Sequence, residues 1–159
     1  MSEIDDVARE LVLLFRGLKG LHREVLAEVG VRLELPATAV LTSLAERGSQ
    51  RLSTVAEVLE LDLSSVSRQV SALEREGWVA RERDPADSRA VLLDLTDAGR
   101  AVLDRVREAR VAHLAARLPG WSPDELRAFA GSLARFRTDL TQHTATTDRT
   151  PALAGQETT

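Results

Sequence analysis

The sequence predicts a mainly α-helical fold with one small β-hairpin. Three observations predict it. Both ends of the chain carry long runs with apolar residues spaced three and four apart, two short helical patterns lie in the middle, and an alternating segment with central turn residues follows them. The chain of 159 residues is long enough for one domain with a single core. We therefore expect long terminal helices around a central helix-turn-helix and hairpin.

The first long pattern runs from Ile4 to Gly30. Its apolar positions keep one face of a single amphipathic helix, which ends at the glycine. A second helix is expected to start after Pro36, since proline suits a first helical turn, and to end at Arg47 and Gly48. Its inward residues are Val40, Leu41 and Leu44.

The C-terminal part predicts two further helices. Thr96 opens the first, which runs towards Leu118, and the segment LPGWSP ends it. Ser122 caps the second, with Pro123 at its first position, and its apolar pattern continues to about residue 142. Residues 143–159 are polar and lack periodicity, so they are predicted to form a disordered tail.

The central segment RLSTVAEVLELDLSSVSRQVSALEREG predicts helix, turn, helix. A short helix buries Val55, Ala56 and Leu59, and a tight break follows around Leu61 and Asp62. A second helix spans about residues 63 to 76, and the next glycine ends it. These lengths and this break are typical of a helix-turn-helix.

The second of these helices has an unusual exposed face. Val66, Val70 and Leu73 are spaced four and three apart and share its buried side. Small hydroxyl side chains let a helix lie close in the DNA major groove, and arginine and glutamine can read guanine and adenine edges. The candidate DNA-reading residues are Ser64, Ser65, Ser67, Arg68 and Gln69. A plain capped surface helix is an equally open alternative.

The segment WVARERDPADSRAVLLDLT predicts a two-stranded hairpin with DPADS at its tip. A hairpin directly after a helix-turn-helix is a wing, whose tip can extend towards the DNA minor groove. We expect Arg89 to enter that groove, Asp87 to pair with Arg89 and hold its orientation, and Arg83 to add a wing contact. The alternative is an ion pair that only stabilises the turn.

The net charge of −4 means that any DNA binding must rest on a local basic patch. Of the 21 basic residues only Lys19 is lysine, and the others are arginine, which forks onto phosphates and base edges. A compositional bias of the source genome explains the arginine content equally well.

Composition and motifs exclude several function classes. The absence of cysteine removes disulfides, thiolate catalysis and thiol redox sensing. His22, His113 and His143 are too scattered for a metal site, and neither a phosphate loop nor a nucleophile elbow is present. We therefore expect no enzyme activity, no catalytic residues and no cofactor. Without a bilayer-length apolar run or a signal peptide, we expect a cytoplasmic protein with no membrane partner.

The segment LSSVSRQVSALEREGWVARERDPADSRAVLLDLTDAGRAVL closely resembles the winged helix-turn-helix of the MarR (multiple antibiotic resistance regulator) family. The likeness is specific over residues 52 to 103 and architectural over about residues 4 to 142. Asp87 and Arg89 correspond to the Asp-x-Arg of the family's wing. The resemblance implies a helical dimerisation region, 4–30 and 96–142, and a winged helix-turn-helix DNA-binding region, 36–95.

The resemblance also implies a function and an effector site. It implies a homodimeric transcriptional regulator on an inverted-repeat operator in double-stranded DNA, commonly a repressor released by a small, often aromatic or phenolic, effector. Family effectors bind between the dimerisation helices and the DNA-reading region. Here that crevice would be lined by Phe15, Arg16, His22 and His113. None of these forms a motif, and a histidine on a helix face is more often a packed or solvated residue than a ligand contact.

Physical considerations also favour a homodimer. The long first helix and the last two helices carry more apolar surface than one small domain covers, so a second chain is expected to bury it. A helical bundle closed within a monomer is the alternative. Two other functions stay open: a winged helix used as a protein-interaction module, and a DNA-binding regulator without a small-molecule effector.

Overall fold

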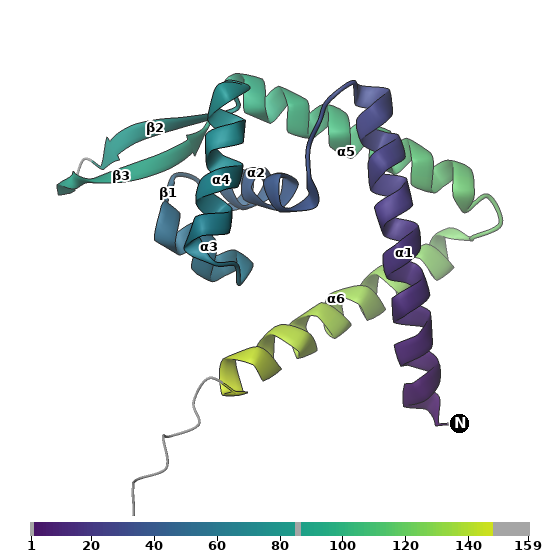
Figure 1. The fold of residues 1–159 in the computed structure, drawn as a ribbon. Helices are drawn as coiled ribbons and strands as arrows, with labels where there is room; N and C mark the ends of the chain where they lie inside the picture. Colours follow the sequence, from purple (N-terminus) through teal and green to yellow (C-terminus); the bar gives the residue numbers. More distant parts are fainter. Residues whose placement is uncertain (1, 85–86, 148–159) are drawn as a thin grey trace, which may run out of the picture. The chain divides into compact units, whose positions relative to one another are not determined.

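A computed structural model describes residues 2–84 and 87–147. It is mainly helical with a small three-stranded antiparallel sheet (Figure 1). The chain divides into two compact units, Met1–Arg117 and Leu118–Thr159. In chain order, the elements are α1 (Glu3–Val29), α2 (Leu35–Arg47), β1 (Gln50–Arg51), α3 (Leu52–Leu59), α4 (Leu63–Arg75), β2 (Val79–Asp84), β3 (Asp87–Leu95), α5 (Asp97–Arg117) and α6 (Pro123–Thr147). The predicted fold class is confirmed.

The helix ends follow local signals in the sequence. Gly30 ends α1 in the left-handed conformation, with φ 73°, which glycine adopts without strain. The α2 helix begins one residue before Pro36, which lies in its first turn. The Ser122 hydroxyl accepts from the Glu125 amide at 3.3 Å and caps α6. That helix continues to Thr147, beyond the predicted end near residue 142, and residues 148–159 of the predicted tail lie outside the described residues.

The core of the first unit forms where α4 packs against α2 and α3. The predicted buried face of α4, Val66, Val70 and Leu73, is at most 1% exposed. The facing α2 residues Val40, Leu41 and Leu44 are fully buried. Burial of one such side chain stabilises the fold by about 1.5–3 kcal/mol. This packing fixes which side of α4 faces outward.

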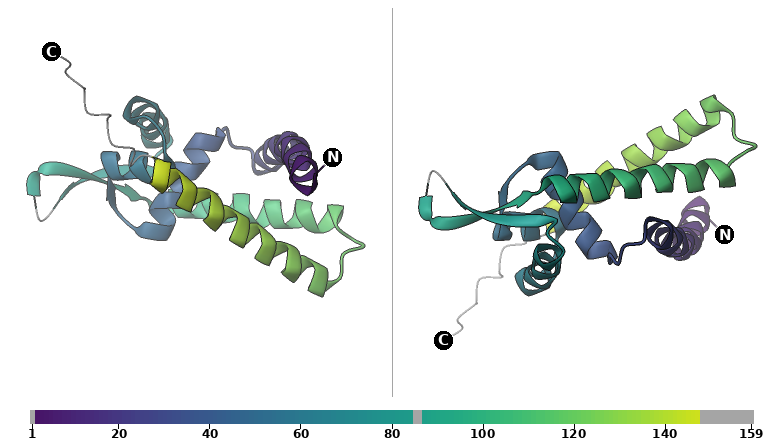
Figure 2. Two further views of the ribbon diagram at one scale, coloured as in Figure 1. Left: turned by 90° about the horizontal axis from the view of Figure 1, so that it is seen from below. Right: turned by 90° about the horizontal axis from the view of Figure 1, so that it is seen from above.

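The sheet has the order β1-β3-β2, and β2 and β3 form the predicted hairpin. Val79 pairs with Leu95 inside the core, and Arg81 pairs with Leu93 one step further out. Beyond these pairs the two strands project past the helices of their unit (Figures 1 and 2). The β1 strand was not predicted, because two residues are too few to carry an alternating pattern.

The start of α5 packs closely on the turn between α4 and β2. The Thr96 hydroxyl donates to the Gly77 carbonyl at 2.7 Å, and the Thr96 Oγ1 atom accepts from the Gly99 amide at 3.0 Å. A Cβ atom at Gly99 would lie 2.2 Å from the Trp78 carbonyl oxygen and 2.7 Å from a Leu95 methyl group. The absence of a side chain at Gly99 therefore permits this junction.

Within the described residues, none of the helices combines the length and apolar character that crossing a bilayer requires.

We predict that Gly99→Ala destabilises the protein by about 1–3 kcal/mol, because the added methyl group overpacks the junction. Alanine is otherwise the better helix former by about 1 kcal/mol. Urea unfolding measures the difference. Gly131→Ala in α6 is the control, since a Cβ there meets nothing within 4 Å. A Gly99→Ala variant as stable as the control would contradict the prediction.

Candidate nucleic-acid interface

The N-terminus of α4 is held by Asp62. Its carboxylate accepts from the Ser65 amide at 2.8 Å and from the Ser64 hydroxyl at 2.5 Å. The sequence had placed Asp62 only in the break between two helices, and the structure makes it the N-cap of α4. Two of the predicted DNA-reading serines therefore also order the first turn of the helix.

These hydrogen bonds change the acidity of Asp62. They lower its pKa from 3.8 to about 2, with the Ser64 hydroxyl as the largest cause, then the Ser65 amide and hydroxyl, and with a smaller effect of the Arg68 charge. The carboxylate stays charged at neutral pH, and its negative charge stabilises the helix because it lies at the positive end of the helix dipole.

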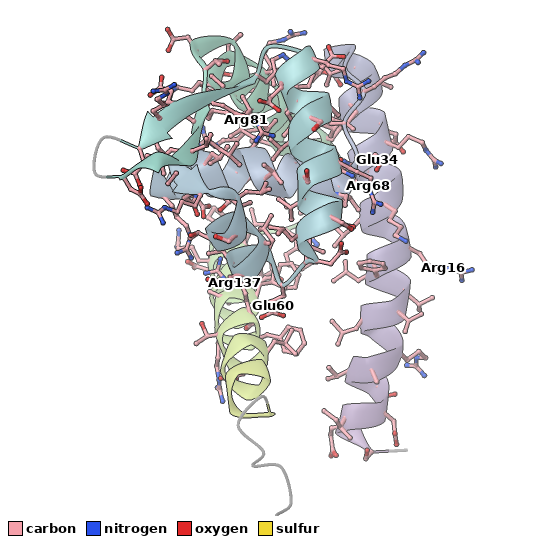
Figure 3. The ribbon with its side chains drawn as sticks, turned by 60° about the vertical axis from the view of Figure 1, so that its left-hand side comes forward. Arg16, Glu34, Glu60, Arg68, Arg81 and Arg137 are labelled. Atoms are coloured by element: carbon pink, nitrogen blue, oxygen red, sulfur yellow. The ribbon has the colours of Figure 1, made fainter. Side chains whose placement is uncertain are left out.

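The predicted DNA-reading residues lie together on the outer side of α4. Ser64 and Arg68 are exposed, and Ser65, Ser67 and Gln69 are half-buried. The Arg68 guanidinium donates to the Ser65 hydroxyl at 2.9 Å, and the Gln69 amide contacts Glu34 at 3.4 Å. Figure 3 shows Arg68 and Glu34 close together beside α4. Arg68 and Gln69, the side chains long enough to reach a base, are thus held only by weak, exposed contacts, which contacts with DNA could replace.

The hairpin is joined to α4 by an ion pair that the sequence prediction missed. Arg81 of β2 donates to both Glu74 carboxylate oxygens, at 2.7 and 3.2 Å, in a fork. The sequence does show opposite charges at positions 74 and 81, on either side of the turn after α4. Only the geometry of that turn shows that the two side chains meet. Arg83 is exposed two residues further along β2, on the same side as Arg81.

The outer end of the hairpin contains the predicted wing residues. Asp87 starts β3, and its carboxylate lies 3.5 Å from Arg51 of β1. Arg89 belongs to the same strand, but its side chain lies outside the described part of the structure, as do residues 85 and 86. The pairing of Asp87 with Arg89 therefore stays a prediction.

A cavity of about 810 Å³ adjoins two of the predicted DNA-reading residues, Arg68 and Gln69. Apolar side chains line it from α1, α4 and the turn after α4, among them Leu26, Leu73 and Trp78, respectively. Arg68 and Gln69 also line it, so these two residues face both the cavity and the outer side of α4. Three further arginines lie on its wall, Arg23, Arg32 and Arg75.

His22 is the one of the four predicted effector-pocket residues that lines this cavity. Its Nε2 atom is buried without a hydrogen-bond partner. Burial lowers the pKa of His22, the Arg110 charge lowers it further, and a hydrogen bond with the Leu33 backbone opposes the shift. A buried, unpaired ring nitrogen can bond a polar group of a ligand.

The other three predicted pocket residues lie elsewhere on the helices. Phe15 is 58% exposed and carries the Lys19 ammonium 4.7 Å above its ring. Arg16 points away from the rest of its unit (Figure 3). His113 of α5 binds α1 instead, with Nε2 at 2.6 Å from the Glu28 carboxylate. The structure thus does not bring the four residues together.

The described side chains include no group of three histidine or acidic residues placed to hold a metal ion.

Residues 33–91 match the model of the MarR family. The HTH-type transcriptional regulator YkoM of Bacillus subtilis (strain 168) is 39% identical over 87 residues, which are 55% of this chain and 56% of YkoM. The HTH-type transcriptional repressor MdtR of the same organism is 31% identical over 134 residues, 84% of each chain. The chain thus spans little more than half the length of YkoM but most of MdtR.

Solved structures show the same architecture. A MarR family protein from Bacillus stearothermophilus matches with a TM-score of 0.77 and 26% identity, over 89% of this chain and 99% of that one. CouR from Rhodococcus jostii RHA1, crystallised with p-coumaroyl-CoA, matches with a TM-score of 0.65 and 25% identity, over 84% of this chain and 92% of CouR.

We predict that the Asp62 cap contributes pH-dependent stability. The carboxyl pKa is lower in the folded chain, so the contribution is full above about pH 4 and is lost as pH falls towards about 2. Urea unfolding at several pH values should show Asp62→Ala less stable than the parent at pH 7. Asp62→Asn keeps a capping oxygen but no charge. The difference in free energy of unfolding between this variant and the parent should therefore shrink as pH falls from about 4 to about 2. A pH-independent difference would contradict this assignment.

Proposed function

The chain belongs to the MarR family, and from this premise we propose that it is a homodimeric transcriptional repressor that binds an inverted-repeat operator in double-stranded DNA. A small aromatic molecule releases it from the operator. The observation that carries the proposal is the outer side of α4, where hydroxyls, Arg68 and Gln69 lie together opposite a fully buried apolar face.

The chemistry of α4 and the hairpin supports DNA reading. Serine hydroxyls and the helix N-terminus suit phosphates, and Arg68 and Gln69 have the length and donors to reach base edges in the major groove. The fork between Arg81 and Glu74 keeps the hairpin beside the helix, as simultaneous contacts with adjacent grooves require. Arg83, Asp87 and Arg89 form the proposed wing contacts.

Exposed apolar side chains support the homodimer. On α1, Ile4 is 71% exposed, and the apolar residues between Val7 and Leu18 are exposed as well. The α6 helix exposes Leu126, Phe129, Leu133 and Leu140. Each of these helices thus exposes a row of apolar side chains, which soluble monomers rarely do, and a second copy would bury them. Two-fold symmetry then spaces the two α4 helices one turn of DNA apart, about 34–36 Å.

The cavity beside α4 supports release by a ligand. A molecule on its apolar wall would lie against Arg68 and Gln69, the same side chains that we assign to base reading. His22 lines the same cavity, and its buried Nε2 is left without a hydrogen-bond partner that a ligand could supply. Binding of ligand and of DNA would then compete for two side chains, which couples the two events. Phe15, Arg16 and His113 do not enter this part of the proposal.

We predict that selection from random duplexes with the purified protein enriches one inverted repeat. Arg68→Ala should weaken binding of that repeat by about 1–3 kcal/mol and relax the preference at the bases that it reads. Arg89→Ala should also weaken binding, mainly at the flanking minor groove. Arg9→Ala serves as the control, since Arg9 pairs with Asp6 within α1 and is not among the proposed DNA-reading residues.

Failure to enrich any sequence, with variants that behave like the parent, would contradict DNA reading. The serine-rich face of α4 would then be tested for a protein partner.

We predict that filling the cavity separates ligand release from DNA binding. Ala27 lines the cavity from α1 and is exposed, so Ala27→Phe adds bulk there without disturbing the core. The first ligands to test are p-coumaroyl-CoA, which CouR binds, and simple phenolic acids, with displacement of a labelled operator as the readout. Ala27→Phe should bind operator within about twofold of the parent and resist displacement.

The matched control is Ala45→Phe, an exposed position on α2 that does not line this cavity. If no aromatic compound displaces the operator from the parent protein, the chain is a DNA-binding regulator without such an effector.

A further inference from the structure

Arg51 connects the first helix of the helix-turn-helix to the outer end of the hairpin. It is the last residue of β1 and the N-cap residue of α3. Its Nη2 atom donates to Asp84 Oδ2 at 2.8 Å and lies 3.5 Å from Asp87 Oδ2. One guanidinium nitrogen thus contacts both strands of the hairpin.

The carboxylates of Asp84 and Asp87 lie opposite each other, where two negative charges repel. Asp84 ends β2, Asp87 starts β3, and they form the last cross-strand pair before the turn. Like charges directly opposite each other in an antiparallel pair are destabilising. The Asp84 side chain is only 12% exposed, so solvent screens its charge weakly. A cation at this point therefore favours closure of the hairpin end.

We propose that Arg51 is the positioning residue of the wing: it compensates the Asp84–Asp87 pair and thereby fixes the segment that presents Arg89. The inference rests on the proposed function, because Arg89 is assigned to DNA only there. Arg89 follows Asp87 by two residues on β3, so a displaced Asp87 displaces the start of Arg89's strand. Arg51 acts on operator affinity through the wing.

The competing role for Arg51 is a direct phosphate contact, since its side chain is 48% exposed. The two roles differ in how Arg51 and Arg89 combine. A positioning residue loses its effect once Arg89 is removed, whereas an independent phosphate contact adds to the effect of Arg89→Ala.

The test is a double-mutant cycle on operator affinity with the full chain. Arg51→Ala should weaken binding about fivefold to tenfold in the parent, but less than about twofold in Arg89→Ala. Hydroxyl-radical footprinting should show that Arg51→Ala and Arg89→Ala lose the same minor-groove protection, while protection by α4 persists. Arg51→Lys keeps the charge and should restore part of the loss. Arg9→Ala, which removes a paired arginine from α1, should leave the affinity unchanged.

A second measurement needs no DNA. Amide hydrogen exchange should be faster in Arg51→Ala than in the parent at the outer end of the hairpin, around residues 82–84 and 87–90, and unchanged at Val79 and Ala80. Additive effects in the cycle, or unchanged exchange at the hairpin end, would overturn the positioning role. If the parent binds no DNA, the proposed function fails, and the exchange measurement alone decides the role of Arg51. If Arg51→Ala does not fold, Arg51→Gln, which also removes the positive charge, takes its place in both measurements with the same expected results.

Discussion

Burial of one face of α4 is the constraint on which the rest of the structure depends. Val66, Val70 and Leu73 enter the core against α2, and this fixes the rotation of the helix about its axis. A helix has only one opposite side, so the same packing places Arg68 and the serines outward. The proposed DNA-reading face is therefore a direct consequence of the hydrophobic core, and loss of core packing would lose this face as well.

Two ion pairs extend this fixed orientation to the hairpin. The fork of Arg81 on Glu74 holds the inner part of β2 to α4, and Arg51 joins the outer end to β1. Arg51 and Arg81 are 48% and 42% exposed, so neither pair adds much to the overall stability, and the main effect of the two pairs is to position the hairpin. The cavity beside α4 shares Arg68 with the outer side of the helix. The α4 helix thus contacts the hairpin and also lines the cavity, all within the first unit.

Most of the fold was predictable because its signals are local. Gly30, Pro36 and Ser122 act within one helical turn, and the spacing of apolar residues identifies buried faces without knowledge of the tertiary structure. The two-residue β1 strand carries no pattern, and the contact of Arg51 with Asp84 joins residues 33 apart in sequence. The cavity was only partly predictable: His22 lines it, but the walls from α4 and the separate environment of His113 arise from packing that no local pattern encodes.

The dependence of operator binding on salt tests the central claim most directly, that the outer side of α4 and the hairpin bind DNA. Each phosphate neutralised by an arginine releases counterions, so affinity should fall about 10³- to 10⁵-fold between about 50 and 200 mM salt for six to ten contacts. Fluorescence anisotropy with the enriched duplex measures this slope. The account predicts a steep fall of operator affinity with salt, and in Arg89→Ala a slope smaller by the amount that about one phosphate contact per subunit contributes. Binding that changes less than about tenfold over this range would contradict it and indicate an interface formed through apolar contacts.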